Sequence, residues 1–139
     1  MIYISCYASN MAMDGIMKII AVAGGGAAGA VARYLINISP LTRWFGSFPT
    51  STFVINITGS ILIGFVMALT IERLVLAENV KLAIVVGFLG AFTTFSTYEF
   101  EILELLRDRQ IATALVYALL SVVVGLIGVA AGFELGRRV

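Results

Sequence analysis

The sequence predicts an all-α integral membrane protein with four transmembrane helices. Of the 139 residues, 60% are hydrophobic and only 12% are charged, whereas soluble domains carry about 25% charged residues. A soluble domain of this size has too little interior to hide so much apolar surface. Four long stretches carry almost no charge and none alternates as strands do, so helices must satisfy the backbone within lipid.

Composition also excludes several classes of function. The chain has no histidine and a single cysteine, Cys6. An internal disulfide, a Cys/His metal site and a histidine-based catalytic triad are therefore excluded. The net charge of +1 provides no polybasic surface for nucleic acid. We expect a role in transport, conduction or assembly, and no enzyme activity.

The charge pattern places the spans. About 20 helical residues cross a hydrocarbon core of roughly 30 Å. The predicted spans are residues 18–38, 52–71, 82–105 and 111–133. Together they form one transmembrane domain over residues 17–139. Residues 1–16 carry Asn10 and Asp14 and lack the layout of a signal peptide, so we expect an N-terminal extension without a role in function.

Small residues and one arginine characterise the first predicted span. Gly25 and Gly29 are four residues apart, a spacing that lets another helix approach closely. Arg33 lies near the end of the span and has two interpretations. Its side chain either reaches the membrane interface or draws anions into a vestibule.

Hydrogen-bond donors follow one face of the second and of the fourth span. Thr52, Asn56 and Ser60 succeed one another at one-turn spacing, as do Tyr117 and Ser121. A carboxamide in lipid is costly unless paired, so Asn56 either bonds to a neighbouring helix or serves a polar pathway. We expect no carboxylate beside these donors, and the two rows therefore favour an anion over a cation.

The third span carries groups that offer its backbone an alternative to continuous helix, namely Gly90, Thr93 and Thr94. Either the helix is unbroken and its hydroxyls bond back to earlier carbonyls, or it is broken at mid-membrane. Freed carbonyls that face each other across a two-fold axis would suit a small hard cation such as Na⁺. Phe95 and Tyr98 share a face. This face either packs in the core or against lipid, or it turns positive ring edges into a pore, where they can contact an anion without trapping it.

The nine basic residues leave the orientation of the chain in the membrane almost undetermined. Four spans put both termini on one side, and the basic residues then divide five to four, nearly without bias under the positive-inside rule. The chain either still inserts one way, or it inserts both ways and permits an antiparallel homodimer. The two groups are Lys18, Arg73, Lys81, Arg137 and Arg138, and Arg33, Arg43, Arg107 and Arg109.

Three segments of the chain resemble a known family. They are GGAAGAVARY from Gly25 to Tyr34, TFVIN from Thr52 to Asn56, and GFLGAFTTFSTY from Gly87 to Tyr98. Tyr117 and Ser121 also stand at the family spacing. Over about residues 17–138, the chain is therefore similar to the Fluc (CrcB) fluoride channels.

The resemblance implies a passive, fluoride-selective channel in the plasma membrane of a prokaryote, which exports fluoride from the cytoplasm and lowers its toxicity. It implies a dual-topology antiparallel homodimer in the bilayer. It also implies a structural Na⁺, not transported, at the dimer centre on the backbone carbonyls of Gly90 and Thr93. The expected fluoride pathway comprises Asn56, Phe95, Tyr98, Thr52, Tyr117, Ser121 and Arg33.

Three positions depart from the family pattern. Ser51 stands where the family often has glycine. Tyr98 stands where the family often has phenylalanine, and we expect its hydroxyl to donate to the ion or to slow it. Glu99 stands where the family often has serine, and we expect its negative charge to affect anion access to the end of the pore.

Two other functions remain open from the residues alone. A small proton-coupled multidrug transporter of the four-helix, dual-topology kind needs a carboxylate within the membrane. The first span has none, and Glu101 in the third is the nearest candidate. A non-conducting helical subunit of a larger complex is the other possibility.

Overall fold

The computed structural model describes the backbone of residues 2–40, 44–73 and 76–139, and the side chains of residues 13–40, 44–71 and 76–139. Four segments are long and apolar enough to cross a membrane: Met13–Asn37, Thr50–Ile71, Glu78–Arg107 and Ile111–Arg138. The predicted all-α fold with four spans is confirmed. Arg43 and the side chains of Cys6, Asn10 and Arg73, considered above, lie outside the described residues.

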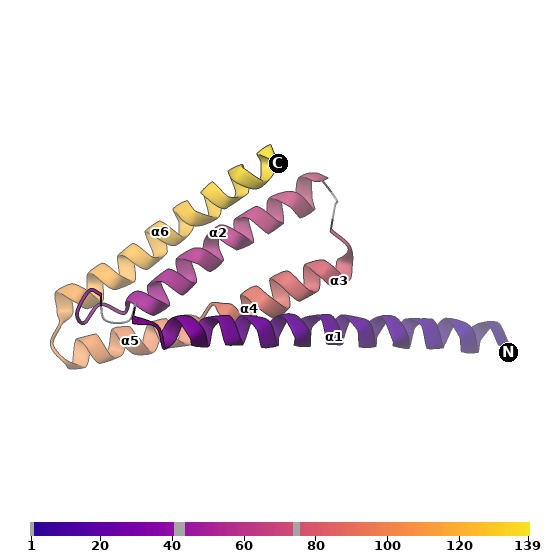
Figure 1. Ribbon diagram of the computed structural model, residues 1–139, viewed down its shortest axis with the longest axis horizontal. Helices are drawn as coiled ribbons and strands as arrows, with labels where there is room; N and C mark the ends of the chain where they lie inside the picture. Colours follow the sequence, from indigo (N-terminus) through magenta and orange to yellow (C-terminus); the bar gives the residue numbers. More distant parts are fainter. Residues whose placement is uncertain (1, 41–43, 74–75) are drawn as a thin grey trace.

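The first, second and fourth spans are single helices, whereas the third is divided (Figure 1). In the third span, a π-helix separates two short α-helices, and α5 follows an interruption at Thr93 and Thr94. The elements are α1 (Ile2–Asn37), α2 (Thr50–Arg73), α3 (Glu78–Lys81), the π-helix η2 (Leu82–Leu89), α4 (Gly90–Phe92), α5 (Phe95–Arg107) and α6 (Ile111–Arg138).

Helix α1 is longer than a span requires. Its 36 residues extend about 54 Å at 1.5 Å per residue, and its N-terminal end projects beyond the other helices (Figure 1). Residues 2–16 continue the helix of the first span without a break. That these residues have no role in function stays a prediction.

The four spans pack as two interleaved pairs. Helix α1 lies along η2 and α4, and α2 lies along α6 (Figure 1). The two pairs diverge from the end of the molecule where α5 lies. The most extensive helix contacts among the described residues therefore join spans that are not consecutive in the sequence, while α5 also packs against the start of α6.

Backbone contact at glycines holds each pair together. A Cβ at Gly25 would meet the carbonyl oxygen of Ala83, and one at Gly29 would meet that of Phe88. In the other pair, a Cβ at Gly132 would meet the Ile61 carbonyl oxygen. These close approaches let dispersion and packing hold helices together in lipid, where the hydrophobic effect contributes little.

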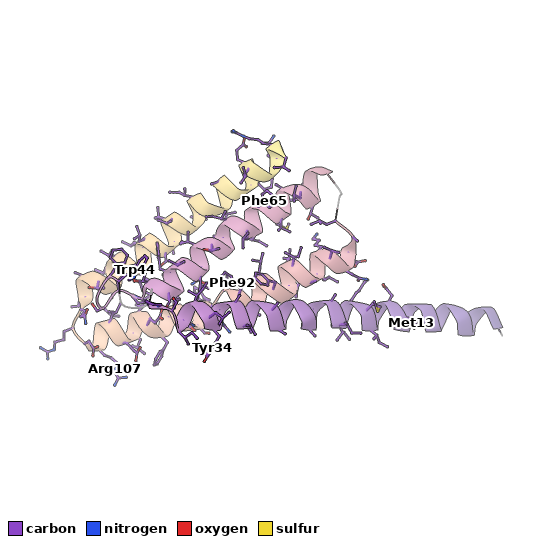
Figure 2. All side chains as sticks on the ribbon, viewed as in Figure 1. Met13, Tyr34, Trp44, Phe65, Phe92 and Arg107 are labelled. Carbon is purple, nitrogen blue, oxygen red and sulfur yellow. The ribbon has the colours of Figure 1, made fainter. Side chains whose placement is uncertain are left out.

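Large apolar side chains cover the outer surface. Tyr34 and Trp44 (Figure 2) are 62% and 68% exposed, and Leu126 on α6 is 67% exposed. In water, so much contiguous apolar surface would be unfavourable and would promote aggregation. Hydrocarbon does not penalise it, which fits the transmembrane assignment.

Candidate functional site

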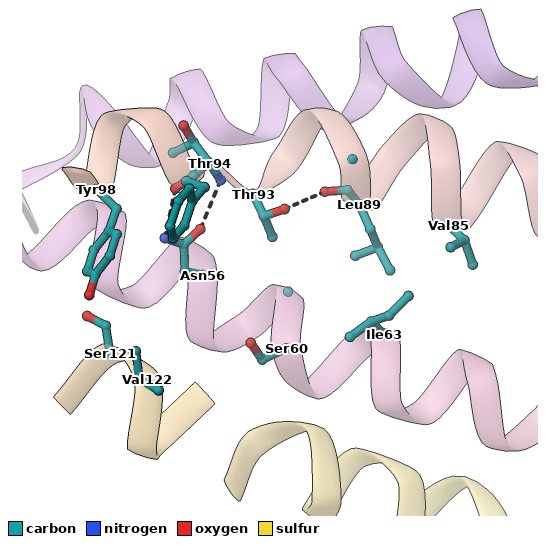
Figure 3. A pocket seen from close by; sticks show the side chains of 13 residues that line it. Asn56, Ser60, Ile63, Val85, Leu89, Thr93, Thr94, Tyr98, Ser121 and Val122 are labelled. Atoms are coloured by element: carbon teal, nitrogen blue, oxygen red, sulfur yellow. Dashed lines mark hydrogen bonds between the residues drawn. The ribbon is translucent and has the colours of Figure 1, made fainter. Parts of the chain in front are cut away.

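A pocket of about 430 Å³ lies between the two helix pairs, beside the interruption of the third span (Figure 3). Every span except the first contributes to its lining, and no lining residue is charged. The polar lining residues are Asn56, Ser60, Thr93, Thr94, Tyr98 and Ser121. The pocket therefore gathers neutral hydrogen-bonding groups from α2, the third span and α6.

The backbone leaves the helix at two successive residues. Thr93 has φ −80° and ψ 159°, and Thr94 has φ −149° and ψ 120°. Thr94 also caps α5, because its hydroxyl oxygen accepts from the Thr97 N–H at 3.3 Å. Threonine suits this position because its side chain replaces a missing helical acceptor.

The side chain of Asn56 reaches across from α2 and pairs with the interrupted backbone. Its Nδ2 donates to the Thr94 carbonyl oxygen at 3.0 Å, and its Oδ1 accepts from the Thr94 N–H at 2.9 Å (Figure 3). A carboxamide nitrogen carries two hydrogens, so the bond to Thr94 leaves a second one to donate. Asn56 thus forms the interhelical hydrogen bond that was one of its two expected roles, and it also lines the pocket.

The interruption also leaves two backbone carbonyls without the N–H groups that would bond to them in a continuous helix. In a continuous helix, the carbonyls of Gly90 and Thr93 would accept from the N–H groups four residues later. The Thr94 N–H instead bonds to Asn56, and the Thr97 N–H bonds to the Thr94 side chain. Carbonyl oxygens released in this way suit a hard cation, so the two residues expected to hold Na⁺ fit that role.

Two aromatic rings from α5 border the pocket, with very different exposure. The ring centroids of Phe95 and Tyr98 are 5.7 Å apart. Phe95 is 71% exposed, whereas Tyr98 is 9% exposed. The Tyr98 hydroxyl donates to the carbonyl oxygen of Ala118 on α6 at 2.9 Å. In this structure, the hydroxyl that was expected to donate to an ion is bonded to the backbone.

The hydroxyl of Ser121 is a buried polar group of the pocket that has no hydrogen-bond partner among the residues that the structure describes. It points from α6 toward Tyr98 at the edge of the pocket (Figure 3). A buried donor without a partner lowers the stability of the fold by about 1–3 kcal/mol. The Ser121 hydroxyl is therefore available to donate to an acceptor that enters the pocket.

Two of the expected donors meet a carboxylate, contrary to prediction. Thr52 donates to one oxygen of Glu101 and the Tyr117 hydroxyl to the other, each at 2.7 Å. Thr52 is 2% exposed and Tyr117 is fully buried. The expectation that no carboxylate lies beside the donor rows was therefore wrong, because helical spacing along one span says nothing about what the facing span presents.

Glu101 also borders a second pocket, of about 580 Å³, between α5 and the loop that precedes α2. Its charged lining residues are Glu101, Glu104, Arg107 and Asp108. Arg33 lines neither pocket, and Glu99 is exposed and likewise absent from both linings. The structure thus brings together all the expected pathway residues except Arg33, in two groups joined by the contact between the Tyr98 and Tyr117 rings, whose centroids are 5.2 Å apart.

Similarity to known sequences identifies the family of this chain. The sequence profile described as "CrcB-like protein, Camphor Resistance (CrcB)" matches residues 20–133. The chain belongs to the CrcB family. The segments from Gly25 to Tyr34 and from Gly87 to Tyr98 both lie within the matched range, so the resemblance expected from them is confirmed.

Several curated relatives of the CrcB family are similar over most of this chain. "Fluoride-specific ion channel FluC 1" of Moorella thermoacetica is 42% identical over 121 residues, 87% of this chain and 86% of its own. The FluC of Roseiflexus sp. is 43% identical over 121 residues, 87% of this chain and 98% of its own. The FluC of Methylococcus capsulatus is 44% identical over 123 residues, and this chain spans about half (54%) of its length.

The family and the fold together indicate the cellular location of the protein. The four spans and the membership of this prokaryotic CrcB family make it a multi-pass protein of the plasma membrane, as predicted. The names of the relatives are those of ion channels and not of enzymes.

Two residues of the site were missed as partners. Glu101 was considered as a proton carrier, as a cap of the pore mouth or as a residue that reaches water, and not as a partner of the donor rows, although it lies three residues after Tyr98 and so near the same helix face. Thr94 was grouped with its neighbours, although Thr97 three residues later provides the N–H that a capping threonine accepts. Both signals are present in the sequence spacing.

Proposed function

We propose that this protein is a passive, fluoride-selective ion channel. The observation that carries the proposal is the uncharged pocket at the interruption, where Asn56 and the unpaired Ser121 hydroxyl supply donors beside the rings of Phe95 and Tyr98. A small anion gains strong hydrogen bonds from such donors. Because no fixed positive charge lines the pocket, the anion is bound weakly enough to leave. The fluoride-channel names of the relatives support the same conclusion.

The proposed pathway continues from this pocket toward the second one. Tyr98 and Tyr117 are in contact, and Tyr117 and Thr52 hold the carboxylate of Glu101. A fluoride ion moving along this line competes with Glu101 for the two hydroxyl donors. Transport is passive, so the ion leaves the cytoplasm whenever its electrochemical potential is higher there, which lowers its toxicity.

The functional unit that we propose is an antiparallel homodimer with dual topology. Phe95 is 71% exposed although it borders the pocket, and Gly90 in the same region is exposed. A second copy, related by a two-fold axis in the membrane plane, would cover this face and close the pocket. The interruption of the third span would then lie near mid-membrane.

A structural Na⁺ at the dimer centre belongs to the same proposal. The carbonyls of Gly90 and Thr93 have lost their helical donors to Asn56 and Thr94. Two such pairs across the axis offer four oxygen ligands. Bound there, Na⁺ would compensate the carbonyl dipoles and would not be transported.

Fluoride efflux from proteoliposomes, followed with a fluoride electrode, tests the proposed function. Vesicles loaded with fluoride and containing the purified protein should release it far faster than empty vesicles, whereas chloride-loaded vesicles should not release chloride. Release no faster than from empty vesicles would contradict the proposal.

Glu101 is the observation that favours a proton-coupled transporter, because it is a carboxylate held between spans. The two functions differ in what Glu101→Gln does. A channel keeps a measurable fluoride flux that is indifferent to a pH gradient. A transporter instead shows a pH-driven flux of its substrate in the native protein, and loses it in Glu101→Gln.

Added positive charge tests the dual topology. Lysines at Ala77 and Val80, both exposed, should bias insertion one way, and this variant alone should yield no fluoride efflux. A variant with lysines at Leu106 and Ile111, exposed at the other end, should be equally inactive alone. Co-expression of the two should restore efflux, and activity of either one alone would refute dual topology.

A further inference from the structure

The hydroxyl oxygen of Ser121 is both buried and without a hydrogen-bond partner among the described residues. A serine or threonine inside a helix can donate to the carbonyl three or four residues earlier. Thr70 bonds to Val66 at 2.8 Å, and Thr93 bonds to Leu89 at 2.9 Å. Ser121 lies in the middle of α6 and makes no such bond.

One of the two carbonyls within reach of Ser121 is already used. The carbonyl three residues earlier belongs to Ala118, and it accepts the hydroxyl of Tyr98 at 2.9 Å. A carbonyl has two lone pairs, and in a helix one of them serves the backbone N–H four residues later. The Tyr98 hydroxyl therefore occupies the position that a back-bonding Ser121 hydroxyl would take.

We propose that Tyr98 is a positioning residue that keeps the Ser121 hydroxyl free to donate to the transported anion. Tyr98 acts through the Ala118 carbonyl and does not itself donate to the ion. Its ring borders the pocket in the place where a phenylalanine would lack this bond. The proposal rests on the proposed function, since it concerns how the same pocket binds its anion.

The hydrogen bond from Tyr98 to Ala118 has a consequence for the binding of fluoride. With Ala118 occupied, Ser121 meets an arriving fluoride without first breaking an internal hydrogen bond. Without the Tyr98 hydroxyl, Ser121 turns to Ala118, and the anion must displace that bond. The expected change is a weaker binding site with no loss of the path itself, so half-saturation changes and the maximal rate does not fall.

A double-mutant cycle between Tyr98→Phe and Ser121→Ala tests this inference. Fluoride current through the dimer in planar bilayers is measured as a function of fluoride concentration. Tyr98→Phe should raise the half-saturating concentration up to about tenfold, the equivalent of the neutral hydrogen bond between Ser121 and Ala118 that the anion must displace. Ser121→Ala should raise it by a similar factor, and the double variant should match Ser121→Ala alone. Tyr34→Phe, at an exposed tyrosine, is the matched control and should change nothing.

The results separate this inference from the function on which it rests. If the native protein carries no fluoride current, the proposed function fails. If it conducts but Tyr98→Phe has the same effect with and without Ser121, Tyr98 acts independently and the inference is wrong. No effect of Tyr98→Phe on half-saturation also overturns it. Should Tyr98→Phe not yield a monodisperse dimer, replacement of Tyr98 by 4-fluorophenylalanine keeps the ring, lacks the donating hydroxyl and completes the cycle with the same expected outcomes.

Discussion

The two halves of the third span differ in what holds them. The first half, α3 to α4, packs against α1 through backbone contact at small residues. A Cβ added at Gly87 would lie only 2.6 Å from the carbonyl oxygen of Val22. The second half, α5, begins at the interruption and is held by side-chain hydrogen bonds through Thr94, Tyr98 and Glu101. One half thus provides a close-packed scaffold, and the other presents polar groups to the pocket and the neighbouring helices.

The largest expected effect comes from changing Asn56, the α2 residue whose side chain pairs with the Thr94 backbone just before the second half. Asn56→Asp removes the donor to the Thr94 carbonyl and places a negative charge beside the pocket. Loss of the hydrogen bond costs about 1–3 kcal/mol, and repulsion adds to it, so fluoride efflux should fall about 100-fold or more. Asn37→Asp, at an exposed position at the end of α1, is the matched control. Efflux of Asn56→Asp equal to that of the control would remove Asn56 from the pathway.

Changes on α1, where it packs against the first half of the third span, should affect stability and not selectivity. A valine at Gly25 would collide with the Ala83 carbonyl, whereas at Gly24 no atom lies within 4 Å of an added Cβ. Gly25→Val should therefore lower the free energy of unfolding by about 1–3 kcal/mol, while Gly24→Val stays within about 0.5 kcal/mol of the native protein. Thermal unfolding in detergent measures both, and equal midpoints for the two variants would contradict the packing described.

The smallest expected effect concerns the residue where the two halves meet. Thr94→Ala removes the cap of α5, which should cost about 1 kcal/mol, while Thr94→Ser keeps the accepting oxygen and should cost less. The same thermal measurement decides this. Equal losses in the two variants would show that the Thr94 methyl group, which both variants lack, matters and its hydroxyl does not.

The scaffold could be predicted from the sequence better than the site. Hydropathy reveals the spans, and small residues four apart, such as Gly25 and Gly29, reveal close-packed faces because both signals are local. The partner of Asn56 could not be predicted, since the Thr94 backbone becomes available only when the helix is interrupted. Thr52 and Tyr117 were correctly seen as donors, but their acceptor Glu101 comes from a third helix, and nothing in the spacing of α2 or α6 identifies it.

The interleaved pairing of the spans has a consequence for biosynthesis. Helix α1 finds its partner only when the third span has been made, and α2 finds α6 only at the end of the chain. Because spans enter the membrane in sequence order, the glycine-rich faces of α1 and α2 must first face lipid or a chaperoning insertase. A chain released before α6 would leave α2 without its partner, so quality control during insertion has an exposed small-residue surface to recognise until the last span is in place.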